Sequence, residues 1–217
     1  MYIEYLGHSC FRIVYQSGVA VVTDPYTKVG YEMPEGVTAD IVTVSHGHYD
    51  HNYIDGVQGA KCVIQTTEKR EIDGVEIYGV ACYHDDKKGE KRGANVAYIL
   101  KGDKITLCHL GDLGEPLNPE LVKAIGKVDI LCIPVGGNYT IDAKQAKAYI
   151  DAVCPSAVIP MHYKPIEGGI DIAPLGEFVT LFTGDNGWQI TPKMQGIRIE
   201  NVREIEGKIV LLERRRK

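Results

Sequence analysis

The stretch Ser45-His46-Gly47-His48-Tyr49-Asp50-His51 decides the fold, because it places three histidines and one aspartate within positions 46–51. It follows an apolar run, residues 41–44, that is typical of a buried strand. Imidazole nitrogens and carboxylate oxygens are the ligands that zinc and similar divalent metals prefer. In an extended segment, side chains two positions apart point the same way. The stretch therefore predicts a metal site, and the alternative is a solvated histidine-rich loop.

Matching ligands occur elsewhere in the chain, which a solvated loop would not require. Four further polar residues each stand at or just past the end of a strand-like run: Asp24, His84, Asp112 and His162. In α/β sheets, the ends of strands are where ligands gather. Any one of these residues alone is more typical of a cap or a turn. The four together favour one shared site.

Short apolar runs rich in Val, Ile and Tyr, bounded by Gly, Asp or Pro, recur along the chain and predict strands. They are residues 2–6, 11–15, 19–23, 41–44, 62–64, 75–80, 96–100, 104–108, 129–133, 157–159 and 178–182.

Helices are fewer. Asn118 and Pro119 predict the start of a helix that Gly126 ends, and apolar spacing predicts a second helix over about residues 142–153. A short helix is expected after His51. This pattern predicts an α/β layered sandwich of two packed sheets with helices outside, in a single domain over residues 1–217.

The composition is ordinary for a globular protein, with 44% hydrophobic and 24% charged residues among 217. The formal net charge is −5 although the last four residues, 214–217, are all basic, so the body of the chain is acidic. We therefore expect no nucleic-acid partner, and we interpret the basic tail as a frayed terminus. No apolar run is long enough for a membrane span, and no signal peptide is evident, so no membrane partner is expected. Six widely spaced cysteines without a CxxC pair favour a reduced, cytoplasmic protein.

The sequence resembles the metallo-β-lactamase superfamily, in particular its compact branch of small metal-dependent hydrolases. The HxHxDH motif of that family is present as His46, His48, Asp50 and His51. The later ligands of the family match His84, Asp112 and His162, and its early aspartate matches Asp24. The segments Leu6-Gly7-His8-Ser9-Cys10, 109–112, 134–137 and 159–163 are also similar to that branch.

The resemblance implies a four-layer αββα sandwich with two mixed sheets and helices outside. It also implies two divalent metal ions, with zinc favoured and Mn²⁺, Fe²⁺ or Ni²⁺ as alternatives. One ion would be held by His46, His48 and His84. The other would be held by Asp50, His51 and His162. Asp112 would bridge the two ions, and Asp24 would orient a ligand imidazole.

The expected activity is hydrolysis of a small ester-type bond, a phosphodiester or a lactone, with Asp50 and Asp112 as catalytic groups and a small anionic molecule as substrate. One alternative is a metal-binding or regulatory protein without catalysis. Another is a di-iron redox protein. His48 stands where the redox members of the family carry Glu, which favours hydrolysis. The oligomeric state is left open.

Four other residues are tentative site residues: His8, His109, Asn138 and Tyr139. His8 is either the acid that protonates the leaving group or a loop-stabilising residue. For His109, a buried hydrogen-bonded role is favoured over contact with the substrate. Asn138 and Tyr139 either help to bind an anion before the second helix or belong to a plain turn. Residues 85–92 are expected to form a solvated hairpin, with the entrance to the site as the alternative.

Overall fold

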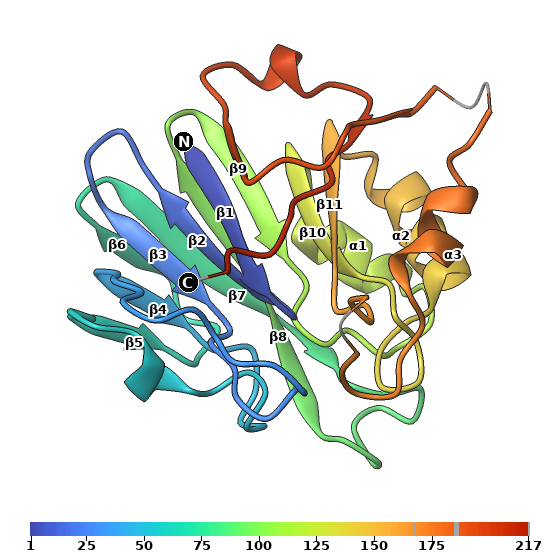
Figure 1. The fold of residues 1–217 in the computed structure, drawn as a ribbon, viewed down its shortest axis with the longest axis horizontal. Helices are drawn as coiled ribbons and strands as arrows, with labels where there is room; N and C mark the ends of the chain where they lie inside the picture. Colours follow the sequence, from blue (N-terminus) through green and yellow to red (C-terminus); the bar gives the residue numbers. More distant parts are fainter. Residues whose placement is uncertain (167, 185–186, 217) are drawn as a thin grey trace.

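A computed structural model describes residues 1–166, 168–184 and 187–216 of the chain. Two mixed β-sheets pack face to face, and the α-helices lie together on one side of the molecule (Figure 1). The six-stranded sheet has the order β13-β1-β2-β3-β4-β5. Its strands are β1 (Tyr2–Gly7), β2 (Cys10–Val14), β3 (Ala20–Thr23), β4 (Ile41–Thr43), β5 (Cys62–Ile64) and β13 (Gly196–Arg198). The pairs from β3 to β5 are parallel and the others are antiparallel.

The eight-stranded sheet has the order β12-β14-β11-β10-β9-β8-β7-β6. Its strands are β6 (Arg70–Ile72), β7 (Val75–Tyr83), β8 (Ala94–Gly102), β9 (Ile105–His109), β10 (Ile130–Pro134), β11 (Ala157–Met161), β12 (Gln189–Ile190) and β14 (Lys208–Ile209). Pairing is parallel from β12 to β9 and antiparallel from β9 to β6. The carboxyl ends of β9, β10 and β11 therefore meet at one edge of this sheet.

The two faces of the six-stranded sheet are buried in different ways. Alternate side chains such as Ile3 and Ile13 pack toward the eight-stranded sheet, in one cluster with Ile99 and Leu107. The opposite face, which includes Val42, is covered by residues 24–40 and the 3-10 helix η1 (Ile54–Gly56) in a second cluster. The predicted layered fold is confirmed, but a loop rather than an α-helix forms the outer layer on this side.

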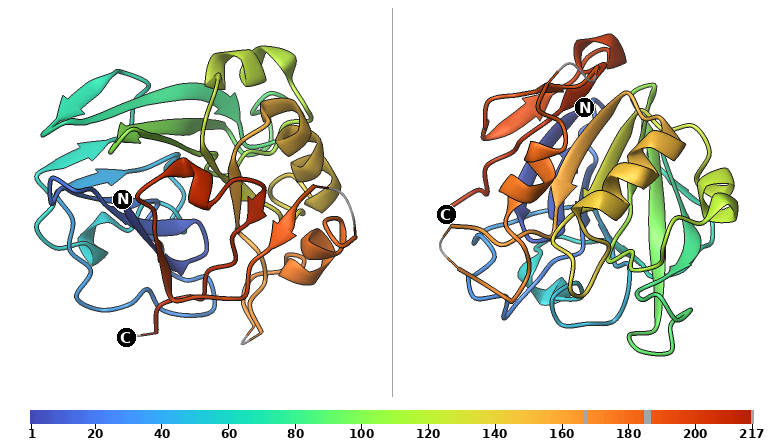
Figure 2. Two further views of the ribbon diagram at one scale, coloured as in Figure 1. Left: turned by 90° about the horizontal axis from the view of Figure 1, so that it is seen from above. Right: turned by 90° about the vertical axis from the view of Figure 1, so that its right-hand side faces the viewer.

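The first helix begins at the cap that the sequence predicts, and the second lies where its apolar spacing predicts. In α1 (Pro119–Ile125), the side chain of Asn118 accepts hydrogen bonds from the N–H groups of the first turn. In α2 (Ala143–Val153), Asp142 and Gln145 form a capping box, each side chain accepting from the backbone N–H of the other residue. Figure 2 shows these helices together with α3 (Leu175–Thr180) on the outer face of the eight-stranded sheet.

Two sequence predictions are wrong. Residues 178–182 were expected to be a strand, but they begin within α3, because a short apolar run fits a buried helix as well as a strand. The basic tail is not frayed over residues 214–216. The N–H of Arg215 donates to the carbonyl of Tyr5 at 2.9 Å, and its guanidinium lies 3.6 Å from Glu4. Lys217 lies outside the described residues.

All six cysteines are free, as expected. Within the part of the chain that the structure describes, every helix is too short or too polar to cross a bilayer.

One buried hydroxyl connects the two sheets beside the histidine-rich stretch. The side chain of Tyr98, on β8, is completely buried. Its hydroxyl oxygen lies 3.2 Å from the carbonyl oxygen of Val44, which follows β4. It also lies 3.1 Å from the carbonyl oxygen of Ile64, the last residue of β5. The chain is thereby fixed to the opposite sheet at the residue just before the histidine-rich stretch.

We expect Tyr98→Phe to lower the free energy of unfolding by about 1–2 kcal/mol, because a buried hydrogen bond is lost without a change in packing. Urea denaturation followed by circular dichroism measures this. The matched control is Tyr83→Phe, at a side chain that is 37% exposed. Equal denaturation midpoints for the two variants would contradict the structural role of the Tyr98 hydroxyl.

Candidate metal centre

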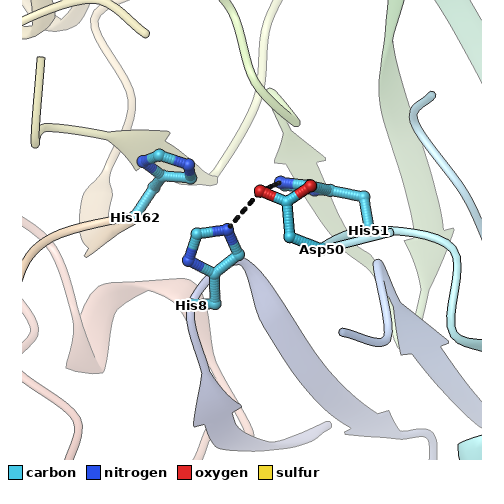
Figure 3. A group of neighbouring side chains, drawn as sticks. All are labelled: His8, Asp50, His51 and His162. Atoms are coloured by element: carbon cyan, nitrogen blue, oxygen red, sulfur yellow. Dashed lines mark ion pairs between the residues drawn. The ribbon is translucent and has the colours of Figure 1, made fainter. Parts of the chain in front are cut away.

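The candidate site lies at one edge of the sandwich, where strands of both sheets end. The histidine-rich stretch follows β4, while His84, Asp112 and His162 follow β7, β9 and β11. His8 comes from the turn between β1 and β2. Figure 3 shows His8, Asp50, His51 and His162 turned toward one another from these separate segments.

The side chains form three overlapping groups whose ligand atoms lie within 4.8 Å of one another. One group is His46, His48 and His84; a second is His8, Asp50, His51 and His162; the third is His46, His51 and Asp112. Of the seven histidines in the chain, only His109 is outside these groups. The structure thus brings together the residues of both predicted ligand sets and adds His8 to the second.

Asp112 lies at the centre of the cluster. One of its carboxylate oxygens is 3.3 Å from Nε2 of His84 and 3.3 Å from Nε2 of His162. The other oxygen is 3.1 Å from Nε2 of His51. Burial opposes ionisation of this carboxyl, but interaction with the imidazoles of His162 and His51 outweighs burial and holds the pKa of Asp112 well below its usual value. A carboxylate between the two predicted ligand sets is suitably placed to bridge two cations.

The donor set fits a divalent metal. Several buried atoms of the cluster have no hydrogen-bond partner among the described residues: Nε2 of His8, His46 and His51, Nδ1 of His84, both ring nitrogens of His162, and Oδ1 of Asp112. Buried polar atoms of folded proteins are nearly always satisfied, and so many exceptions in one place call for an explanation. Cations at this site would supply one. That these residues hold ions, and how many, stays a prediction.

Asp24 orients the imidazole of His51. Its Oδ2 accepts from Nδ1 of His51 at 2.8 Å, which leaves Nε2 directed at the cluster. Burial favours the neutral carboxyl, yet the hydrogen bond from His51 prevails and lowers the pKa of Asp24. This is the contact that the expected orienting role requires.

Ser45 extends the same network to His46. Its hydroxyl donates to Asp24 at 2.6 Å and its N–H donates to the other carboxylate oxygen at 2.8 Å. The hydroxyl oxygen is then free to accept from Nδ1 of His46, 3.0 Å away. One carboxylate therefore fixes two ring orientations. Ser45 lies in the stretch that predicts the site, but nothing in the spacing indicated this role.

The second residue that sequence reasoning missed is Asn95, on β8. Its side-chain oxygen accepts from the N–H of Asp112 at 3.0 Å, and its amide donates to the carbonyl of Leu110 at 2.9 Å. Between these two residues, Gly111 has φ = 54°, and an added Cβ would lie 2.5 Å from the oxygen of Asn95. Only glycine fits this turn, so Gly111 and Asn95 together fix the backbone that presents Asp112.

Three side chains of the site stand on left-handed backbone, which is uncommon outside glycine. The φ angles are 55° at His8, 41° at Asp24 and 52° at His162. Hydrogen bonds hold the peptide of His8: its N–H donates to the hydroxyl of Tyr31 at 3.0 Å, and its carbonyl accepts from the hydroxyl of Tyr5 at 2.9 Å. The same carbonyl accepts from the N–H of His162 at 2.8 Å.

The ring of His8 belongs to the cluster. Its Nε2 is 3.4 Å from a carboxylate oxygen of Asp50, and its ring centroid is 4.2 Å from that of His162. Burial, reinforced by His162, lowers the pKa of His8 to about 4. His8 is therefore not merely a loop residue, although its chemical role stays a prediction.

His109 faces away from the cluster. Its Nε2 donates to the carbonyl of Ser9 at 2.7 Å, and its Nδ1 accepts from the N–H of Gly111 at 3.2 Å. Both ring nitrogens are occupied, which is the buried, hydrogen-bonded arrangement that the sequence favoured. His109 supports the turn before Asp112.

Asn138 and Tyr139 belong to none of the three groups. The amide of Asn138 donates to the carbonyl of Asp171 at 2.7 Å, and the N–H groups of Tyr139 and Thr140 both donate to Gly137. These groups are engaged within the loop, as the plain-turn interpretation requires, and α2 begins with its own capping box. The geometry gives no support to an anion contact here.

Residues 85–92 form a compact loop around one carboxylate. Asp85 accepts from four backbone N–H groups, those of Lys87, Gly89, Lys91 and Arg92. These bonds overcome the effect of burial and lower the pKa of Asp85 to about 2. The guanidinium of Arg92 lies 5.3 Å from the ring centroid of Tyr139. The loop is thus held by hydrogen bonds to a buried carboxylate, which the sequence did not indicate.

The model of the beta-lactamase superfamily domain matches residues 2–162, which include every residue of the cluster. The chain belongs to the β-lactamase superfamily. A metallo-β-lactamase superfamily protein from Thermotoga maritima is 33% identical, with a TM-score of 0.77, and the match covers 97% of this chain and 98% of that one.

Two curated relatives carry the name UPF0173 metal-dependent hydrolase. The protein from Carboxydothermus hydrogenoformans is 30% identical over 82% of this chain and 90% of its own length. The protein from Thermococcus onnurineus is 26% identical over 74% of this chain and 84% of its own length. The superfamily assignment accounts for the two-sheet scaffold and for a histidine-rich site at its edge.

We expect Asp24→Asn to lower the affinity for Zn²⁺ about 10- to 100-fold, because the amide no longer fixes the tautomers of His51 and His46. Competition with a chromophoric chelator measures the affinity. Asp40→Asn is the matched control, since Asp40 lies just before β4 and pairs with Lys61 on the surface. Thermal denaturation of both metal-free variants separates loss of metal from loss of folding. Unchanged zinc affinity in folded Asp24→Asn would refute the orienting role.

Proposed function

We propose that this chain is a metal-dependent hydrolase that cleaves a small ester-type bond, either a phosphodiester or a lactone. The observation that carries the proposal is the convergence of six histidines and two aspartates on one buried cluster with unpartnered ring nitrogens. The relatives support the same class, since they are named metal-dependent hydrolases and the Thermotoga maritima protein is named as a candidate Zn-dependent hydrolase.

The predicted ligand sets assign a role to each side chain. His46, His48 and His84 would hold one ion, and Asp50, His51 and His162 the other, with Asp112 between them. A pair of bound divalent ions supplies a water of lowered pKa at neutral pH and polarises the electrophilic oxygen of the substrate. Asp112 would orient the attacking water and accept its proton. No serine or cysteine nucleophile is needed.

Asp50 is the second candidate for proton handling. Its side chain is 15% exposed, whereas that of Asp112 is 2% exposed, so Asp50 is the more accessible of the two carboxylates. His8 contacts Asp50 through Nε2 and would pass a proton to the leaving group; since its pKa is lowered to about 4, this contribution is expected to grow as the pH falls toward that value. His48 is also exposed and marks the open side of the cluster.

A small anionic substrate suits this arrangement, because a site that holds cations attracts negative charge. Both substrates react by attack of an activated water, on the phosphorus of a phosphodiester or on the carbonyl carbon of a lactone. The predicted metal ligands would serve either reaction. Assays on a panel of substrates are therefore needed to distinguish the two substrate classes.

Removal of metal provides the direct test. We expect full-length protein dialysed against EDTA to lose hydrolysis of bis(p-nitrophenyl) phosphate or of a γ-lactone by at least 100-fold, and to regain it when Zn²⁺ or Mn²⁺ is restored, because the nucleophile depends on the ions. Activity that survives complete demetallation, verified by elemental analysis, would exclude the mechanism.

The same experiment tests the alternatives. Two bound ions with no turnover on any ester, phosphodiester or lactone would favour a metal-binding protein without catalysis. Two irons with a charge-transfer band would favour a redox protein. The fold of the chain also occurs in CmlA, a diiron β-hydroxylase from Streptomyces venezuelae, with a TM-score of 0.51 and 15% identity, a likeness that shows the fold alone.

His8→Ala tests the proton-delivery role. We expect turnover to fall about 10²- to 10⁴-fold while metal content stays unchanged, since general acid catalysis contributes that much. Metal content by elemental analysis and turnover are measured on the same sample. Unchanged turnover would remove the role, whereas loss of metal would place His8 among the ligands. Lys127→Ala is the control, as that residue is exposed and lies outside the metal-binding groups.

A further inference from the structure

A sizeable cavity lies apart from the metal cluster. It has a volume of about 630 Å³ and lies between the end of β1, the segment after β11, the start of α3 and the chain after β14. None of the residues of the three metal-binding groups lines it. Its size falls in the range of about 300–1,000 Å³ that is typical of small-molecule pockets.

The wall of the cavity is mostly apolar. Its lining includes the rings of Tyr5 and Tyr163 and the side chains of Val179 and Leu212, all of them largely buried. At the rim stands Ile166, which is 97% exposed. Such a surface suits the hydrocarbon part of a ligand, since burial of apolar area is favourable by about 25 cal/mol per Å².

The charged residues of the lining are predominantly basic. Among the lining residues that the structure describes, four are cationic, Lys164, Lys193, Arg214 and Arg216, and one is anionic, Glu213. This local excess of positive charge occurs in a chain whose formal net charge is −5. The side chain of Gln195 donates to Glu213 on the same wall, so this acidic group has a hydrogen-bond partner. Charge complementarity therefore favours an anionic ligand.

The turn that carries His8 contacts both the metal cluster and residues that line the cavity. Tyr5 and Tyr31 line the cavity, and their hydroxyls bond the carbonyl and the N–H of His8. The guanidinium of Arg214 lies 4.4 Å from the ring centroid of Tyr31. The pocket is thus built onto the turn that carries His8, on well-packed residues.

We propose that this cavity is a second binding site, for a small amphiphile with an anionic head and an apolar body. The apolar part lies against the tyrosine and leucine side chains, and the head pairs with the lysine and arginine side chains at the rim. The site goes beyond the hydrolase proposal and does not rest on it, because no residue of the metal cluster takes part.

The test uses isothermal titration calorimetry on the full-length protein after EDTA treatment, so that a carboxylate has no metal to bind. The probes are octanoate, octylammonium, which has the same chain with the opposite charge, and acetate, which has the head without the chain. We expect octanoate to bind at least tenfold more tightly than either of the other two. Equal binding of octanoate and octylammonium, or no binding of octanoate, would overturn the proposal.

Two variants locate the binding. Lys193→Glu reverses a charge of the rim and is expected to weaken octanoate binding at least fivefold. Lys127→Glu, an exposed change outside the pocket, is expected to leave it unchanged. Equal effects of the two changes would indicate attraction by overall charge and would overturn the assignment.

The variant Gly176→Phe is designed to reduce the volume of the cavity. Gly176 lines the cavity at the start of α3, and a Cβ added there meets no heavy atom within 4 Å, so the variant is expected to fold. We expect it to bind octanoate at least fivefold more weakly with an unchanged melting temperature and unchanged zinc affinity. Full octanoate affinity in this variant would place the ligand elsewhere. Because zinc affinity is measured separately, failure of this site is distinguishable from failure of the hydrolase proposal.

Discussion

The structure of the site depends on keeping the Asp112 carboxylate ionised while it is buried among imidazoles. Water contributes little to its solvation, since the side chain is 2% exposed. Interaction with the imidazoles of His162 and His51 replaces that solvation and lowers the pKa of the carboxyl. Several ring nitrogens nevertheless remain without partners. An arrangement of this kind is unfavourable for stability by itself, and it is typical of sites whose purpose is binding or catalysis.

The scaffold sustains this arrangement through a small number of buried contacts. Asp24 fixes His51 directly and His46 through Ser45, while Asn95 holds the turn that presents Asp112. Other hydrogen bonds hold the left-handed peptides of His8 and His162, which are bonded to Tyr5, Tyr31 and each other. The geometry of the cluster is therefore a property of both sheets and not of the histidine-rich stretch alone.

His8 connects the two regions of the molecule that are suited to binding. Its ring lies against His162 and Asp50 in the metal cluster, and its peptide is held by the hydroxyls of Tyr5 and Tyr31. Those tyrosines line the cavity whose rim is basic. A ligand in the cavity would contact side chains that position His8, so the two sites have a physical route for mutual influence. The C-terminal residues contribute to this route, since Arg214 stacks on Tyr31.

By itself, the sequence determined the layered fold, the strand ends that carry ligands, the cap of α1 and the span of α2. These features depend on local hydrophobic period, on turn residues and on a dense cluster of metal-ligand side chains in residues 46–51. The local pattern cannot decide the secondary structure of residues 178–182, because a short buried run suits a helix or a strand equally. The tertiary structure alone decided that His8 joins the cluster, since a lone histidine next to a turn suits a site or a loop equally well, whereas His109 has the buried, hydrogen-bonded position that the sequence favoured. It also decided the roles of Ser45 and Asn95, the docking of the basic tail and the existence of the cavity. Each of these arises from contacts between residues far apart in the chain, and spacing along the sequence carries no information about them.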